Sequence, residues 1–284
     1  MKFKHFLLVF LLVFLFFGCR AIVAEKQNND ELLIINGSDE LAVDFNNEIG
    51  DFNDVRENDG ALLVEEYVQK NESKQGIEEV KEQENPDFLD YPVPFVSQAP
   101  FGHWDELHQE ACEEASMIMA VKYLRNEPLT LHIMEQGILS LVKWQEDNGY
   151  KVDLTAEETV EVLDAYFNIY SELIVNPTVE IIKNELFLGR LIVIPVAGRK
   201  LGNPYFTQPG PIYHMLLIRG YDNRVNEFIT NDPGTRRGEG YRYNYHRLID
   251  ANHDWDHELA ESGMTEEKIK QGRRVVISVI GDIK

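Results

Sequence analysis

The residues best suited to covalent chemistry are a cysteine, a histidine and an aspartate that lie far apart in the sequence. Cys112 stands three positions before a mainly apolar run, residues 115–124, which predicts a buried helix with the thiol at its N-terminus. A helix N-terminus and a neighbouring imidazolium both lower the pKa of a thiol, and the thiolate is the nucleophilic form. The pattern predicts a nucleophilic cysteine that needs a histidine partner, and the alternative is an inert cysteine packed in the core.

The histidine partner is indicated by a hairpin pattern in residues 213–232, where two strand-like runs flank a short turn. If the turn centres on Asn223, His214 lies opposite Asp232, with the two Cβ atoms about 5 Å apart on one face. Asp232 could then hold the imidazole as the third member of a nucleophile, base and orienter triad. A register shift of one residue would bring Asn231 to this place instead. An ordinary cross-strand polar pair is the remaining alternative.

Two carboxylates follow the thiol directly, Glu113 and Glu114. Negative charge favours the start of a helix, but it would raise the pKa of a thiol that it faced. The triad therefore requires both side chains to point away from Cys112.

Residues beyond the hairpin include a group that could suggest metal binding: His246, His253, His257, Asp254 and Asp256. Their spacings match no standard zinc signature, and a polar loop or helix start explains them better. We expect neither a metal nor another cofactor.

The elements that must position the triad are helices first and strands afterwards. Helical periodicity continues in "LTLHIMEQGILSLVKW", in "TAEETVEVLDAYF", where Thr155 and Glu158 have capping-box spacing, and in "TVEIIKNELFLG", which ends at Gly189. Strands are predicted at residues 191–197, 213–221, 226–232 and 274–280. This order indicates an α+β fold in which N-terminal helices pack on a C-terminal antiparallel sheet.

The N-terminus, residues 1–24, has the pattern of an export signal. Two lysines and a histidine precede the unbroken apolar run 6–17, which is shorter than the roughly 20 residues that span a bilayer. Cleavage and lipidation at Cys19, cleavage after Ala24, and retention as a membrane anchor all remain open. We expect an exported protein, extracellular or in the cell envelope, whose exported part holds one free thiol, Cys112.

Charge divides the remaining chain. The net charge is −22, and residues 25–90 alone hold 20 acidic and 5 basic residues. The composition of residues 25–87 therefore predicts a largely disordered acidic tether, and the folded domain is expected at residues 88–284. The absence of a basic patch argues against nucleic acid as a partner.

The combination of "VPFVSQAPFGHWDELHQEACEEASMIMAVKYL", "GPIYHMLLIRGYD" and "FITNDPGTRRGEGYRYNY" resembles the peptidase domains related to bacteriocin-processing, double-glycine leader peptidases, a branch of the papain-like cysteine peptidases. The resemblance covers roughly residues 90–284. It implies a papain-like fold with Cys112 as nucleophile, His214 as general base and acid, Asp232 as orienter and Gln98 as side-chain donor to the oxyanion hole. Fourteen positions separate Gln98 from Cys112, so the intervening loop must fold back. Gln109 lies nearer in sequence and is the second candidate for this role.

The resemblance implies a thiol hydrolase that cleaves a peptide or related amide bond in a peptide or protein substrate. Acyl transfer, with an amine in place of water, and a non-catalytic cell-surface binding domain that retains the fold are the alternatives. We expect a monomer.

Overall fold

The computed structural model describes residues 23–26, 32–36, 39–43 and 85–282, which belong to two compact units, Met1–Glu82 and Gln83–Lys284. In the first unit, β1 (Val23–Lys26), β2 (Leu32–Asn36) and β3 (Asp39–Val43) form an antiparallel sheet in chain order. The apolar run at β2 pairs with a neighbour on each side. The disorder predicted for residues 25–87 as a whole stays a prediction. The other predicted tether residues up to 84, and residues 1–22 of the predicted export signal, lie outside the described residues.

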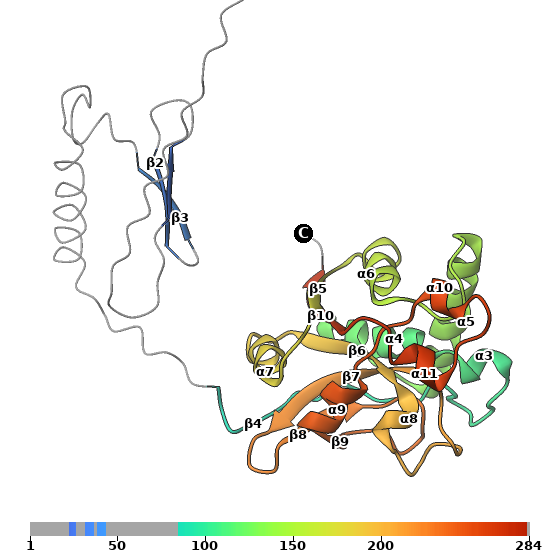
Figure 1. Cartoon of the computed structure of the whole chain (residues 1–284). Helices are drawn as coiled ribbons and strands as arrows, with labels where there is room; N and C mark the ends of the chain where they lie inside the picture. Colours follow the sequence, from blue (N-terminus) through green and yellow to red (C-terminus); the bar gives the residue numbers. More distant parts are fainter. Residues whose placement is uncertain (1–22, 27–31, 37–38, 44–84, 283–284) are drawn as a thin grey trace, which may run out of the picture. The chain divides into compact units, whose positions relative to one another are not determined.

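The second unit is an α+β domain built around one sheet (Figure 1). Its helices are α3 (Glu106–Gln109), α4 (Cys112–Leu124), α5 (Leu131–Asp147), α6 (Ala156–Ala165), α7 (Val179–Phe187), α8 (Gly198–Leu201), α9 (Tyr245–Ala251), α10 (His257–Ala260) and α11 (Glu266–Ile269). Its strands are β4 (Phe88–Asp90), β5 (Ile169–Val175), β6 (Leu191–Ala197), β7 (Tyr213–Asp222), β8 (Glu227–Asn231), β9 (Tyr241–Asn244) and β10 (Val275–Asp282).

The sheet is antiparallel throughout, in the order β5-β10-β6-β7-β8-β9, and β4 pairs with the far end of β7. Alternation along β7 sends Tyr213, Met215 and Leu217 into the core that α4, α5 and α6 cover. Leu216 and Ile218 enter a second core, on the face that α7 and α9 cover. The predicted fold class and the four predicted strands are confirmed, whereas β4, β5 and β9 were not predicted.

Helix starts follow the sequence signals closely. Thr130, Thr155 and Thr178 cap α5, α6 and α7, and the capping box of Thr155 with Glu158 is present. Helices α4 and α8 lack such a cap, because their N-cap residues, Ala111 and Ala197, offer no side-chain hydrogen bond. The N-terminus that carries Cys112 is therefore free of a side-chain cap.

The hairpin of β7 and β8 has a different register from the predicted one. Its turn spans residues 223–226, because Asp222 pairs with Glu227, and an extra residue in β7 shifts the ladder between Ile218 and Gly220. Leu217 consequently pairs with Asn231, the last residue of β8. Continued by one step, this register would set Asp232 opposite Leu216 rather than His214.

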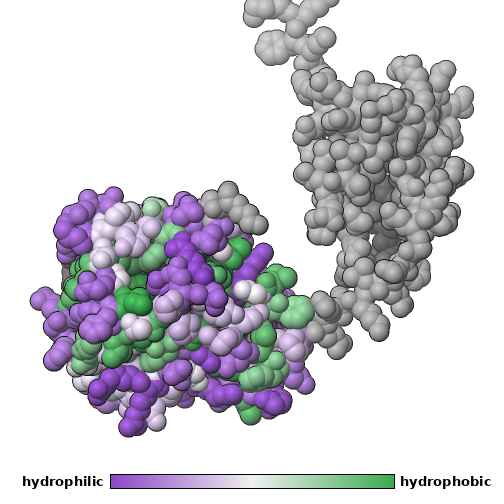
Figure 2. Space-filling view, turned by 180° about the vertical axis from the view of Figure 1, so that it is seen from behind, coloured by the Kyte–Doolittle hydropathy of each residue, from purple (hydrophilic) through white to green (hydrophobic). Residues whose placement is uncertain are grey.

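The surface of the domain mixes hydrophilic and hydrophobic side chains. Figure 2, which views the chain from behind Figure 1, shows green hydrophobic surface between purple hydrophilic regions. Phe101 and Trp104 are among the exposed large hydrophobic side chains, and both belong to the loop that leads to Cys112. The loop that precedes the thiol in the sequence thus exposes aromatic surface.

Candidate active site

Cys112 is the first residue of α4 and is almost fully buried, with 5% of its surface exposed. Its S–H donates to Oε2 of Glu113 at 3.0 Å, and its sulfur accepts a hydrogen bond from the backbone N–H of Met215 at 3.3 Å. The thiol therefore lies between its own helix and the start of β7. The free N-terminus of α4 and this strand are the two elements that position it.

The expectation that both carboxylates point away from the thiol is wrong for Glu113. Helix α4 is buried around its whole first turn, so the side chain of Glu113 cannot reach solvent and instead contacts the sulfur. Burial raises the pKa of the Cys112 thiol well above its ordinary value, the carboxylate of Glu113 raises it further, and the Met215 N–H opposes both. In this conformation Cys112 is a protonated thiol at neutral pH.

His214 and Asp232 form a buried pair, as predicted. Nε2 of His214 lies 2.8 Å from Oδ1 of Asp232, and the two residues are 2% and 0% exposed. Burial raises the pKa of Asp232, but the charge and hydrogen bond of His214 and a hydrogen bond from Tyr243 lower it below its ordinary value overall. Because a carboxylate only accepts, the hydrogen of the neutral imidazole lies on Nε2 and Nδ1 is left as the basic atom.

Three further residues fix Asp232, and sequence reasoning missed all of them. The hydroxyl of Tyr243 donates to Oδ2 at 2.6 Å, the amide of Asn203 donates to the same oxygen at 3.1 Å, and the N–H of Gly234 donates to Oδ1 at 3.0 Å. Gly234 also packs so closely on the imidazole that an added Cβ would lie 2.9 Å from Cε1 of His214. The alternation of "YRYNY" gave a signal for a strand, but nothing in the sequence linked it to Asp232.

Asn231, the reserve candidate, faces away from the imidazole. Its amide donates to the carbonyl of Val93 at 3.1 Å and to that of Pro94 at 3.3 Å, while its oxygen accepts from Gly240 N–H. It therefore fastens the segment after β4 to the end of β8.

Cys112 and His214 approach the site from different sides of β7. Cys112 belongs to the core beneath α4, whereas the imidazole packs edge-on against Phe206 of the other core, with ring centroids 5.4 Å apart. Among the described residues no hydrogen bond joins the thiol to the imidazole; the link between them is the backbone, since Met215 N–H contacts the sulfur one residue after His214. Rotation of Cys112 about its Cα–Cβ bond moves the sulfur between staggered positions.

Gln98 shapes the loop before the thiol. Its amide nitrogen donates to the carbonyls of His108 and Gln109, both at 3.0 Å, so the loop folds back as predicted. Both amide hydrogens are thereby engaged, and the side-chain oxygen is buried without a hydrogen-bond partner. Gln109, the second candidate, points its own amide to the carbonyl of Trp104 at 3.0 Å.

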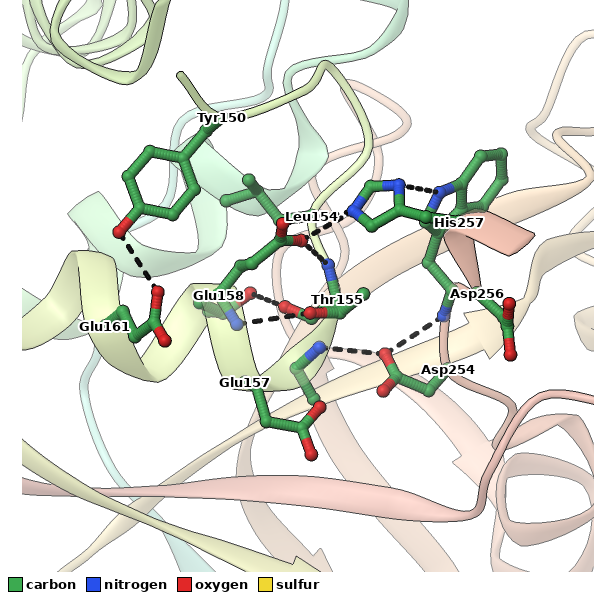
Figure 3. Close-up of polar contacts among 12 residues, drawn as sticks. Tyr150, Leu154, Thr155, Glu157, Glu158, Glu161, Asp254, Asp256 and His257 are labelled. Carbon is green, nitrogen blue, oxygen red and sulfur yellow. Dashed lines mark hydrogen bonds and ion pairs between the residues drawn. The ribbon is translucent and has the colours of Figure 1, made fainter. Parts of the chain in front are cut away.

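The histidine and aspartate group near the C-terminus has structural partners. His257 Nε2 lies 2.9 Å from Oε2 of Glu158, and Asp254 accepts the N–H of Ala156 at 2.9 Å, so both support the start of α6 (Figure 3). Asp256 caps α10. Over the described residues, no group of three or more His, Cys, Asp or Glu side chains is arranged to hold a metal ion.

Comparison of the chain with known proteins identifies its family. Residues 91–258, more than half of the chain, match the model of the "Peptidase_C39 like family". Comparison with curated proteins gave no match. Among solved structures, a protein described as a C39-like peptidase from Bacillus anthracis is 14% identical, with a TM-score of 0.45 over 69% of this chain and 99% of that one. Xylellain, a cysteine protease from Xylella fastidiosa, is also 14% identical, with a TM-score of 0.34 over 70% of this chain and 87% of that one. The family match covers Cys112, His214 and Asp232 together, and the chain belongs to the peptidase C39-like family.

Proposed function

We propose that the protein is a cysteine peptidase that cleaves a peptide or related amide bond through Cys112, His214 and Asp232. The observation that carries this proposal is the buried His214–Asp232 pair. Asp232 contacts Nε2 of the imidazole, so Nδ1 is available as a base. The residue after His214 is Met215, whose backbone N–H contacts the Cys112 sulfur. Membership of the C39-like family supports the same reaction class.

The proposed reaction begins when the Cys112 side chain turns toward His214. Nδ1 takes the thiol proton, the sulfur forms a bond to the substrate carbonyl carbon, and the carbonyl oxygen becomes an oxyanion. The backbone N–H of Cys112 at the uncapped start of α4 stabilises this charge, and Gln98 joins it by releasing one of its two carbonyl partners.

Collapse of the intermediate breaks the C–N bond, and the proton on Nδ1 passes to the leaving amine. Water then attacks the thioester: His214 takes a proton from the water, the S–C bond breaks, and the proton returns to the sulfur. Asp232 keeps its charge throughout and stabilises the imidazolium that forms twice in the cycle.

Active-site trapping tests this function directly. The purified chain is incubated with a peptide library and with a peptide carrying a thiol-directed electrophile, and the adduct is located by mass spectrometry. We expect cleavage and an adduct on Cys112, both lost in Cys112→Ser, while Cys19→Ser leaves both unchanged. Formation of an amide when an amine is added would identify acyl transfer. A folded protein with neither cleavage nor adduct would instead be a binding domain.

For location, we propose export through the N-terminal apolar run, residues 6–17, which lies outside the described residues. No helix in the described part of the chain is long and apolar enough to cross a membrane. Cell fractionation with mass spectrometry of the mature N-terminus tests the proposal. A lipid on Cys19, a start at Glu25 and an intact N-terminus are the three expected forms, and an intact chain found only in the cytoplasm would contradict export.

A further inference from the structure

The side chain that contacts the proposed nucleophile, Glu113, has no part in the reaction steps above. It is fully buried, follows Cys112 directly and accepts the thiol hydrogen at 3.0 Å. We propose that Glu113 is a positioning residue: it holds the Cys112 sulfur in an inward, protonated state and so sets the pH at which this cysteine becomes a nucleophile. The inference rests on the proposed function, because it concerns the nucleophile of that reaction.

The carboxyl of Glu113 is fixed by a backbone contact on its other oxygen. Oε1 accepts the N–H of Leu154 at 3.3 Å, which leaves Oε2 to face the sulfur. Leu154 is itself held, because its carbonyl accepts the hydroxyl of Tyr213 at 2.9 Å. One oxygen of the carboxyl group thus has a backbone partner that does not depend on the thiol.

A polar network stabilises the segment that carries Leu154, as Figure 3 shows. The next residue, Thr155, caps α6 and donates its N–H to Glu158 at 2.8 Å. Glu158 also contacts His257 Nε2 at 2.9 Å, and His257 Nδ1 accepts the indole N–H of Trp255 at 3.2 Å. The support of Glu113 therefore extends across two elements distant in sequence.

The titratable groups around the pair are almost all acidic. Glu114 follows Glu113 on α4, Asp153 precedes α6, and Tyr213 lies on β7. The charge of Glu110 raises the pKa of Asp153, and the charge of Asp254 raises the pKa of Tyr213. Burial raises the pKa of Glu113 well above its ordinary value, and the charges of Glu114 and Asp153 raise it further. His257 opposes this trend only through Asp153. These buried and mainly acidic surroundings disfavour a thiolate beside an ionised Glu113, because two negative charges would share one buried site.

This electrostatic conflict links orientation to reactivity. While Oε2 accepts the S–H, the sulfur makes no hydrogen bond to the imidazole of His214 within the described structure. To attack, Cys112 must break this hydrogen bond and rotate, which leaves Glu113 with its Leu154 partner alone. The stronger the Glu113 contact, the higher the pH at which Cys112 reacts with small electrophiles.

The decisive measurement is the pH profile of thiol alkylation in the full-length chain. Iodoacetamide labelling is followed from pH 5 to 10 by mass spectrometry of the peptide that contains Cys112, which separates it from Cys19. In Glu113→Gln the amide oxygen must still accept the Leu154 N–H, so the NH₂ group faces the sulfur and stabilises a thiolate. We expect the midpoint to move to lower pH and labelling at pH 7 to accelerate about tenfold, the effect of one pKa unit.

Glu114→Gln is the matched control, because it removes a neighbouring buried carboxyl that makes no hydrogen bond to the sulfur. We expect it to move the midpoint much less than Glu113→Gln does. Glu113→Asp provides a second variant if Glu113→Gln fails to fold: its shorter side chain cannot contact both Leu154 and the sulfur, so labelling should again accelerate. A folded Glu113 variant whose profile matches the unaltered chain overturns the proposal.

The outcomes separate this inference from the proposed function. If Glu113→Gln shifts the labelling profile but no variant cleaves any peptide, the positioning role stands and the peptidase assignment fails. If the unaltered chain cleaves peptides through Cys112, but the pH profile of Cys112 labelling is the same with and without Glu113, the peptidase assignment stands and the positioning role is wrong.

Discussion

His214 and Asp232 are in contact although the sheet does not pair them. The observed ladder, continued by one step, sets Asp232 opposite Leu216, and the side chains of Leu216 and His214 point to the same face because they are two residues apart. The predicted pairing of β7 with β8 was wrong by two positions, which leaves Asp232 on the same face of the sheet as His214. An error of one position would have put Asn231 on that face instead.

The first prediction separates these two neighbours. Asp232→Ala should lower kcat by roughly 10²–10⁴-fold, because the imidazole loses the carboxylate that fixes its tautomer. Asn231→Ala should lower kcat much less and instead reduce the melting temperature, because Asn231 holds the carbonyls of Val93 and Pro94. Peptide kinetics and thermal unfolding of both variants check this. A folded Asn231→Ala enzyme with the larger loss of kcat would refute the assignment of Asp232.

The second prediction concerns the tyrosine that contacts Asp232. Tyr243→Phe removes the hydroxyl that donates to Oδ2 at 2.6 Å, so the carboxylate retains Asn203 alone on that oxygen. Since a hydrogen bond to a charged group is worth about 1.5–3 kcal/mol, we expect kcat to fall about tenfold and the pH optimum to shift. Tyr241→Phe is the control, because the hydroxyl of Tyr241 makes no hydrogen bond to Asp232 within the described structure. Equal kinetics in the two variants would count against a role for Tyr243.

The third prediction tests what Gln98 does. Gln98→Ala removes both donors from the carbonyls of His108 and Gln109, so the loop before Cys112 should loosen and the melting temperature should fall by several degrees. If Gln98 also joins the oxyanion hole, kcat should fall about 100-fold with little change in KM. A lower melting temperature with unchanged kcat would restrict Gln98 to a structural role.

The fourth prediction is a pH dependence of stability. Burial raises the pKa of Glu114 to about 7, so the folded chain binds this proton more tightly than the unfolded chain does. The resulting stabilisation is complete below about pH 4.5 and is lost as the pH rises toward 7. Glu114→Gln should therefore flatten the fall in free energy of unfolding between pH 5 and 7.5, as measured with urea. Asp153, whose pKa is also raised to about 7, should keep part of the slope.

The exposed Glu146 of α5 supplies the comparison for this experiment. Glu146→Gln should leave the slope between pH 5 and 7.5 unchanged, because the side chain of Glu146 is on the surface of the folded chain. If Glu114→Gln and Glu146→Gln behave alike, the buried carboxyl is not the source of the pH dependence.

Periodicity predicted most of the fold because the core residues follow it. Thr155 with Glu158 fixed the start of α6, and the continuous apolar run of β6 marked a strand buried on both faces. Strand β5 begins directly after Asn168, whose left-handed backbone with φ of 55° ends the helical segment, and it was missed because only its first four residues alternate between buried and exposed positions. Strand β9 is only four residues long and carries a tyrosine-rich pattern that a loop also tolerates.

The candidate site was predictable where residues lie near each other in the hairpin and unpredictable where loops converge. His214 and Asp232 share one hairpin, and the even register that the prediction assumed is restored by the extra residue in β7: the turn pairs Asp222 with Glu227, and the shift between Ile218 and Gly220 returns Asp232 to the face of His214. Asn203 reaches Asp232 from the loop after α8, and the contact of Glu113 with the thiol depends on how completely α4 is buried. Both facts belong to tertiary packing, which a helical period does not encode.

Strand β4 determines where a mechanical pull on the N-terminal side of the chain would act. Its three residues pair with the last part of β7, Phe88 with Asp222, Leu89 with Tyr221 and Asp90 with Gly220. Eight residues after β4, the N–H of Gln98 donates to the carbonyl of Pro233, next to Asp232. Tension applied to the chain before β4 must therefore separate these pairs, and then the hydrogen bonds of Asn231 to the carbonyls of Val93 and Pro94, before it reaches Gln98. The pairing of β4 with β7 thus shields the site from force on the chain that precedes it.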